Sequence, residues 1–194
     1  MAKVIDIRNV KKEDIPQDEV FAVDTNALIW THYSKASSPH INKHPYQVIE
    51  YPNFISKLMS NGNKIVTTTL NITELCNVTE RNEYRIYKAI SKKSSLSFKD
   101  FRKIQTERIN YKNEIDTMIM EIKAAYDNQI EIINVSAEII ENYRKELCQN
   151  SCDVFDFIAI EHLKKLGIHN YITDDKDFAT VSDINLYTTS EELS

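Results

Sequence analysis

The chain of 194 residues contains very little glycine, few cysteines and no long apolar run. With only two glycines, neither a Gly-x-Gly-x-x-Gly loop nor a Gly-Lys-Ser/Thr loop occurs, which excludes nucleotide-binding classes built on those loops. No apolar stretch approaches the roughly 18 residues that a membrane span needs, and the N-terminus lacks the pattern of a signal peptide. We therefore expect a cytoplasmic protein with no membrane partner.

The three cysteines, Cys76, Cys148 and Cys152, are an odd number in a chain without an export signal. We expect reduced thiols rather than a disulfide framework. Cys148 and Cys152 lie four residues apart, as do His40 and His44, and both spacings can place two zinc ligands on one side of a helix. A structural zinc site is therefore the alternative to the carboxylate site described below.

The net charge of −5 is unevenly distributed along the chain. Residues 81–125 contain eleven Lys or Arg against six Asp or Glu, a net +5, so the rest of the chain carries −10. A basic helical segment attached to an acidic body suits a polyanion bound on one part and metal ions held on the other. A solvated helix face explains the same pattern without any partner, and both interpretations stay open.

Short apolar runs alternate with segments of helical periodicity. We expect strands at 20–23, 65–68, 130–135, 171–173 and 184–187, after an irregular lead-in over 1–19. We expect helices at 27–33, 48–59, from 72 onward, at 136–147 and from 151 or 153 to 165, and two helices within 81–128 separated near 94–97. This alternation predicts an α/β fold, a three-layer α/β/α sandwich with a central, mainly parallel sheet of four to five strands. We expect residues 1–194 to form one domain, with an added basic helical segment at about 81–128.

Acidic side chains occur where the expected strands end or where the neighbouring helices begin. In a parallel sheet, ligands bind outside the carboxyl ends of the strands. The acids in these places are Asp24, Glu74, Asp153, Asp156, Asp174, Asp175 and Asp177. Segments far apart in the sequence therefore deliver acids to the same edge of one sheet.

Carboxylates gathered at one edge repel one another, so clustering them is unfavourable unless a cation neutralises them. A set of oxygen ligands without His or Cys suits Mg²⁺ or Mn²⁺ rather than Zn²⁺. Such an ion lowers the pKa of a water molecule and stabilises the charge on a phosphoryl group in transfer. We expect Mg²⁺ or Mn²⁺ as the cofactor.

Each acid also has a structural explanation. Glu74 fits the third position of a capping box that begins at Asn71. Asp24 and Asp153 stand where helix N-caps are expected, and the acids after residue 173 suit a turn. Asp156 has the weakest structural explanation, because an uncompensated acid among apolar neighbours is unfavourable. The joint occurrence of the acids favours the functional interpretation.

Four motifs in this order resemble those of the PIN-domain nucleases. A hydrophobic strand ends in Asp24-Thr25-Asn26, and Thr73-Glu74-Leu75 opens a helix after the next strand. An Asp then heads an apolar helix ending in Gly, over 156–167, and a last strand runs into Thr-x-Asp-x-Asp-Phe, over 171–178. The resemblance extends over roughly residues 20–190 and is carried best by the first and last motifs.

The resemblance implies a metal-dependent endoribonuclease that hydrolyses RNA phosphodiester bonds. The implied catalytic and metal-binding acids are Asp24, Glu74, Asp156 and Asp175. Asp153 is a rival or helper for the third position, and Asp177 is expected to take part through a water molecule. The implied polar groups that orient acids or phosphate are Thr25, Asn26 and Thr173.

The resemblance also implies partners. RNA is the expected substrate, an antitoxin protein is the expected partner if the chain is the toxin of a toxin–antitoxin pair, and such nucleases often form homodimers. The chain is longer than small PIN toxins, and the helices between Glu74 and Asp153 have three open interpretations, namely a substrate platform, a dimer surface or a partner-binding clamp.

Other functional classes fit less well. A phosphatase of the HAD type needs a second Asp two residues after the first, and this chain has Asn26 there. A receiver domain needs an adjacent acidic pair after its first strand, which is absent. The alternative from a different class is a catalytically inactive PIN-like module that binds RNA or protein, and it would bind RNA without binding metal.

Overall fold

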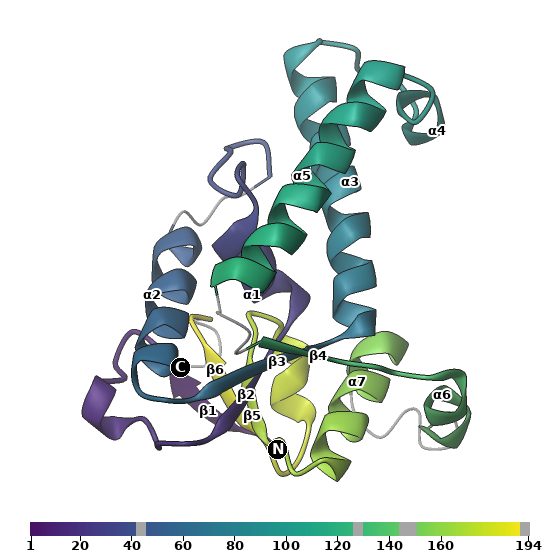
Figure 1. Cartoon of the computed structure of the whole chain (residues 1–194). Coiled ribbons are helices and arrows are strands. Elements are labelled where there is room, and N and C mark those ends of the chain that lie inside the picture. Colours follow the sequence, from purple (N-terminus) through teal and green to yellow (C-terminus); the bar gives the residue numbers. More distant parts are fainter. Residues whose placement is uncertain (42–45, 126–129, 144–150, 191–194) are drawn as a thin grey trace.

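A single six-stranded sheet with all strands parallel forms the centre of the computed structural model (Figure 1), which describes residues 1–41, 46–125, 130–143 and 151–190. The strands follow the order β1-β6-β5-β2-β3-β4. Their bounds are β1 Lys3–Asp6, β2 Val20–Val23, β3 Lys64–Thr68, β4 Ile130–Ile133, β5 Asn170–Ile172 and β6 Asn185–Thr188. The predicted α/β class is confirmed, and the five expected strands are all present.

The sheet is larger than the sequence predicted, because the first residues also form a strand. The expectation of an irregular lead-in over 1–19 was wrong for Lys3–Asp6, which pairs with β6 so that Val4 lies opposite Leu186. The strand has only two apolar residues, Val4 and Ile5, within a polar segment, so its local pattern does not indicate a strand. The observed sheet is therefore six-stranded and wholly parallel within the described residues.

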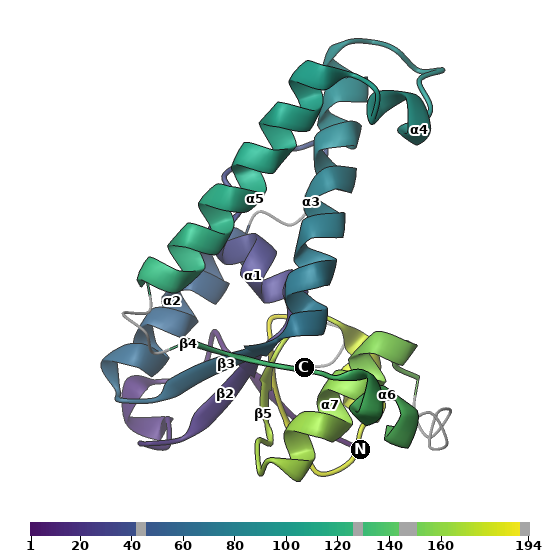
Figure 2. The same cartoon turned by 45° about the vertical axis from the view of Figure 1, so that its right-hand side comes forward.

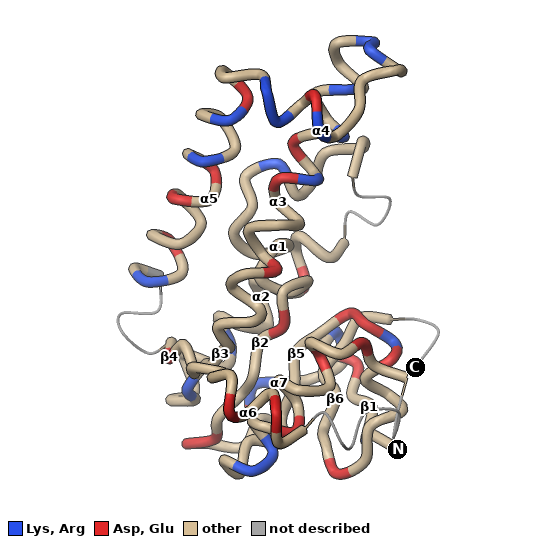
Figure 3. The backbone as a smooth tube through the Cα atoms, turned by 90° about the vertical axis from the view of Figure 1, so that its right-hand side faces the viewer, with Lys and Arg blue, Asp and Glu red and all other residues tan. Residues whose placement is uncertain are grey.

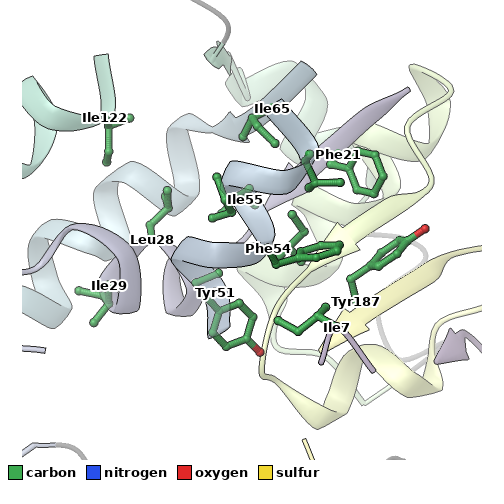
Figure 4. Close-up of a cluster of buried hydrophobic side chains, with 14 of the residues drawn as sticks. Ile7, Phe21, Leu28, Ile29, Tyr51, Phe54, Ile55, Ile65, Ile122 and Tyr187 are labelled. Atoms are coloured by element: carbon green, nitrogen blue, oxygen red, sulfur yellow. The ribbon is translucent and has the colours of Figure 1, made fainter. Parts of the chain in front are cut away.

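Helices cover both faces of the sheet and make the three layers. Helices α1 (Thr25–His32) and α2 (Gln47–Ser60) lie on one face, and α7 (Val154–Lys165) lies on the other. The side chains of β2 alternate accordingly, with Phe21 in one apolar cluster and Ala22 in the other. Figure 4 shows part of the first cluster, in which side chains from α1 and α2 meet Phe21 of β2, Ile65 of β3 and Tyr187 of β6.

Two long helices project from the sheet as an arm. Helix α3 (Thr69–Ile90) runs outward, the short α4 (Phe98–Phe101) lies at the far end, and α5 (Gln105–Ala125) returns beside α3 (Figures 1 and 2). The expected separation near 94–97 is confirmed, since α3 ends at Ile90 and the Ser97 hydroxyl caps α4. Lys and Arg gather toward the far end of the arm (Figure 3).

The aromatic residues of the arm pack against one another. The rings of Tyr84 and Phe98 lie with centroids 5.2 Å apart, and those of Tyr84 and Phe101 lie 5.5 Å apart. Phe101 is fully buried. The far end of the arm is therefore held by its own small core.

The remaining helices complete the α7 side. Helix α6 (Ala137–Tyr143) begins as expected, whereas residues 144–147 of the predicted 136–147 helix lie outside the described part. Helix α7 ends before Gly167, whose φ of +79° is the left-handed conformation expected of a residue that terminates a helix. None of the described helices is both long and apolar enough to cross a membrane.

Candidate metal centre

Three of the predicted acids converge at the carboxyl edge of the sheet. Asp24 directly follows β2, Glu74 lies in the second turn of α3 just after β3, and Asp156 lies in the first turn of α7. One carboxylate oxygen of each lies within 4.8 Å of the others. Three elements far apart in the sequence thus meet at the edge where parallel sheets hold their ligands.

Asp24 is oriented by two hydrogen bonds rather than by a capping role. It occupies the N-cap position of α1, but its side chain makes no capping hydrogen bond. Its Oδ1 accepts a bond of 2.9 Å from Asn71 Nδ2, and its Oδ2 accepts one of 2.7 Å from the Thr173 hydroxyl. The side chain is buried, so these two donors fix the direction in which the carboxylate points.

Glu74 is also free of a capping role. The N-cap of α3 is Thr68, whose hydroxyl oxygen accepts from the Asn71 N–H at 3.2 Å. The capping-box explanation for Glu74 was therefore wrong, because the helix begins three residues earlier than that box requires. The Thr25 hydroxyl donates to Glu74 Oε2 at 2.7 Å and tethers this exposed carboxylate to the start of α1.

Asp153 and Asp156 have different positions at the start of α7. Asp153 is the N-cap, and its Oδ1 accepts from the backbone N–H groups of Phe155 at 2.8 Å and Asp156 at 3.0 Å. Asp156 is half-buried and lies in the three-acid cluster, whereas Asp153 is exposed and lies outside it. Of these two rivals, the geometry favours Asp156 as the third acid.

The acids after β5 lie beside the cluster. Asp175 is half-buried, and its Oδ1 accepts from the Asp177 N–H at 2.9 Å at the start of the short 3-10 helix η2 (Lys176–Thr180), while Asp177 is exposed. The Thr173 hydroxyl links Asp175 to the cluster, since it accepts from the Asp175 N–H at 3.0 Å while donating to Asp24. Asp174 instead accepts hydrogen bonds from Tyr51, Thr189 and Gln47 and ties α2 to the sheet.

One residue that orients the cluster was not predicted. Asn71 was interpreted as a helix cap, yet its side-chain amide donates to Asp24. The available signal was its spacing from Glu74, since residues three apart share one face of a helix. Of the predicted orienting residues, Thr25 and Thr173 hydrogen-bond to acids of the cluster, whereas Asn26 lies half-buried in the first turn of α1.

The electrostatics of the cluster are strongly unfavourable to free carboxylates. Burial raises the pKa of Asp24 above its ordinary value, and the charges of Glu74 and Asp175 raise it further. Burial also raises the pKa of Asp156, and the neighbouring acids add to the effect. Within the described part of the chain, no Lys or Arg forms an ion pair with Asp24, Glu74 or Asp156.

A divalent cation fits this environment. The three acids offer oxygen ligands only, which is the preference of Mg²⁺ and Mn²⁺. Such an ion would neutralise the negative charge of the three carboxylates, which no Lys or Arg of the described residues offsets by an ion pair. The residues present therefore fit a magnesium or manganese ion.

The zinc alternative finds no support in the described residues. Burial and nearby acids raise the pKa of Cys152 to about 12, so in the metal-free protein its thiol is protonated. Its predicted partner Cys148 lies outside the described part of the chain, and so does His44, the predicted partner of His40. Among the residues described, Asp24, Glu74 and Asp156 are the group whose ligand atoms lie close enough together to hold an ion.

Of two pockets in the structure, one lies beside the acidic cluster and the other lies away from it. A pocket of about 650 Å³ lies near the amino ends of the strands, where Lys3, Asn170 and Asn185 begin β1, β5 and β6. A smaller pocket of about 230 Å³ lies between α3 and α7 and is lined by Glu74 itself. The smaller pocket therefore adjoins the acids, and the larger one does not.

No family model and no curated protein matches the chain. Among solved structures it is similar to the crystal structure of VapBC2 from Rickettsia felis bound to a DNA fragment from their promoter. That match has a TM-score of 0.49 and 17% sequence identity, and it covers 87% of this chain and 98% of the other. The site described above rests on the geometry of this chain alone.

Proposed function

We propose that the chain is a Mg²⁺- or Mn²⁺-dependent endoribonuclease of the PIN class. The observation that carries this proposal is the convergence of Asp24, Glu74 and Asp156 within 4.8 Å at the carboxyl edge of a parallel sheet. The motifs that resemble PIN nucleases contribute these same three acids. Asp175 is the fourth member, held beside them through Thr173.

The residues of the chain have distinct tasks in this activity. A bound divalent cation supplies a water of lowered pKa and offsets charge on the phosphoryl group. Asn71 and Thr173 hold the Asp24 carboxylate in one orientation, and Thr25 does the same for Glu74. Such supporting hydrogen bonds preorganise ligands and strengthen metal binding. The products are a 5′-phosphate and a 3′-hydroxyl.

Single-stranded or looped RNA is the proposed substrate. Unstacked strands expose their bases and bend more readily than duplexes. The arm carries the net +5 of residues 81–125, and the acids lie where the arm joins the sheet. Attraction between the positive charge of the arm and the RNA phosphates thus offsets the repulsion between the RNA and the acidic body.

The substitution Asp24→Asn tests the activity. We expect cleavage of single-stranded RNA in Mn²⁺ to fall more than about a hundredfold, beyond what loss of a group supporting a metal ligand causes. Glu74→Gln repeats the test at an exposed position where folding is not at stake, and the exposed Asp14→Asn is the matched control. Undiminished cleavage by both pure, folded variants would contradict the proposal.

The toxin role is a finer part of the same proposal and rests on the resemblance. We expect a small antitoxin encoded next to this gene, and growth arrest on expression that coexpression of the antitoxin relieves. We also propose a cytoplasmic homodimer, which sedimentation of the purified protein tests. Growth arrest that persists in the Asp24→Asn variant would contradict the toxin role.

A module that binds RNA without cleaving it is the second candidate. The positive arm supports it, because RNA binding by the arm needs no metal. Calorimetry with Mn²⁺ separates the two candidates. A binding module would hold RNA while showing neither metal binding nor turnover.

A further inference from the structure

The pocket between α3 and α7 is continuous with the acidic cluster. Its volume is about 230 Å³, and Glu74 belongs both to its wall and to the cluster. The rest of the wall combines apolar side chains, Leu70 and Val78 of α3 and Phe155 of α7, with the cation Arg81. A ligand in this pocket would therefore lie directly beside the acids.

Phe155 is unusual for its exposure at this place. Its side chain is 63% exposed and belongs to none of the apolar clusters in the described residues. Its backbone is nonetheless fixed, because the Phe155 N–H donates to the Asp153 carboxylate at 2.8 Å. An anchored aromatic ring open to solvent, next in sequence to Asp156, is suited to stacking on a planar group.

Arg81 lies on the same face of α3 as Glu74. Seven residues separate them, close to two helical turns, which corresponds to about 10 Å along the helix axis. The Arg81 side chain is exposed and forms no hydrogen bond or ion pair with any residue that the structure describes. The face continues outward with Arg85 and Lys88, so α3 carries a line of cations from the pocket into the arm.

We propose that this pocket holds one nucleotide of a single-stranded RNA, adjacent to the phosphodiester at the acidic cluster. The base stacks on Phe155 with Leu70 and Val78 beside it, and a neighbouring phosphate pairs with Arg81. The guanidinium is suited to this task because its planar fork matches two phosphate oxygens. The strand then follows Arg85 and Lys88 along α3. This inference rests on the proposed ribonuclease function and names how its substrate is held.

The charge of the pocket favours RNA over an apolar protein segment as the occupant. A hydrophobic side chain inserted between Leu70, Val78 and Phe155 would leave Arg81 without a counterion. A nucleotide suits both side chains, because its base can stack on the Phe155 ring while its phosphate pairs with Arg81. Without a bound metal the acids beside the pocket weaken binding of the anion, and Arg81 offsets part of their charge, so RNA binds in chelator although less tightly.

The test measures binding of a short, labelled single-stranded RNA of mixed sequence to the full chain in chelator, where no cleavage occurs. We expect Phe155→Ala and Arg81→Gln each to weaken binding about tenfold, the order found when a stacking aromatic is removed. The matched controls are Val154→Ala, an exposed apolar neighbour outside the pocket, and Lys123→Gln, an exposed cation of α5. Both controls should bind as the wild type does. Phe155→Trp, which keeps a stacking ring, should restore affinity where Phe155→Leu does not.

RNAs with a single abasic position test whether one base of the strand stacks on Phe155. With the abasic position placed in turn at each point along the strand, affinity for the wild type should fall most at one position, and Phe155→Ala should abolish that dependence. Equal loss in Phe155→Ala and Val154→Ala, an unchanged Arg81→Gln, or wild-type binding of an apolar peptide but not of RNA would each overturn the proposal. Wild-type RNA binding through Phe155 without Mn²⁺-dependent cleavage would uphold the pocket and reject the nuclease, which keeps the two proposals separate.

Discussion

At the scale of single residues, the candidate centre depends on small polar side chains that direct larger acidic ones. Thr173 donates to Asp24 while accepting from the Asp175 N–H. Thr25 donates to Glu74, and Asn71 donates to Asp24. These bonds hold mutually repelling carboxylates in place before any ion binds.

Replacing Thr173 by Val should weaken Mn²⁺ binding about 10- to 100-fold, the usual effect of losing a group that orients a metal ligand. The branched shape is kept, but Asp24 Oδ2 and the Asp175 N–H both lose their partner. Calorimetric titration measures the affinity. Thr173→Ser keeps the hydroxyl and is the control, so equal affinities of the two variants would contradict the role given to Thr173.

The raised pKa of Asp156 predicts a pH-dependent stability of the metal-free protein. Its pKa in the folded protein lies above the ordinary value near 3.9, so the folded state binds the proton more tightly than the unfolded state does. The stability contributed by protonation is therefore complete below about pH 4 and is lost as the pH rises through the folded pKa.

The variant Asp156→Asn removes this dependence. In chelator at mildly alkaline pH we expect it to exceed the wild type in free energy of unfolding by about 1 kcal/mol or more, since each pKa unit corresponds to about 1.4 kcal/mol. The advantage should shrink toward acidic pH, and Mn²⁺ should stabilise the wild type but not the variant. Thermal unfolding across pH measures both. A constant difference at all pH values would count against the raised pKa.

At the scale of elements, the first turns of the helices decide which acids are free to bind an ion. Helix α3 starts at Thr69 and is capped by Thr68, which leaves Glu74 free in its second turn. Helix α7 uses Asp153 as its cap, which leaves Asp156 free. The roles of the acids therefore follow from where each helix begins.

Asp153→Ser should separate the two acids of α7. Serine keeps a capping oxygen while removing the charge, so helix stability should change by only a few tenths of a kcal/mol. Manganese affinity should also fall only slightly, because an exposed charge is largely screened by solvent. Asp156→Asn should abolish manganese binding in the same titration. The reverse ranking would make Asp153 the third acid.

Elements with a clear apolar pattern were predictable from the sequence, whereas the strand in the polar lead-in and the exact starts of helices were not. The five strands from β2 to β6 and the helices between them follow from apolar periodicity, and the acids at their ends follow from the parallel sheet. The strand β1 was missed because only pairing with β6 makes its four residues a strand. The choice between Asp153 and Asp156, and the role of Asn71, depended on cap positions that shift by a residue or two without a visible change in pattern.

At the scale of the whole molecule, the net charge differs in sign between the arm and the body. The arm of α3, α4 and α5 carries a net positive charge and its own aromatic core, and the three acids lie at the sheet edge where the arm begins. Some arm cations are neutralised internally, as Arg102 is by Glu80. Others, including Lys92 and Lys99, are exposed and form no ion pair within the described residues.

Removing the charges of Lys92 and Lys99 should change the salt dependence of RNA binding. Each phosphate contact that is lost should reduce the slope of log affinity against log salt by about 0.7 for a single strand. Titrations of RNA at several salt concentrations measure the slope of Lys92→Gln/Lys99→Gln. Mn²⁺ affinity should stay unchanged, since neither residue is near the acids in sequence or on the sheet edge. If log affinity depends on log salt with the same slope in the variant and the wild type, Lys92 and Lys99 do not contact RNA phosphates.

Helix α3 connects these regions without interruption, since its 22 residues include both Glu74 and three cations of the arm, Arg81, Arg85 and Lys88. The angular relation between the acid and the cations is therefore fixed by the number of residues between them. One inserted residue after Glu74 would rotate everything beyond it by about 100° around the helix axis. In this chain the length of a segment, as much as its composition, determines which side of the arm faces the acids.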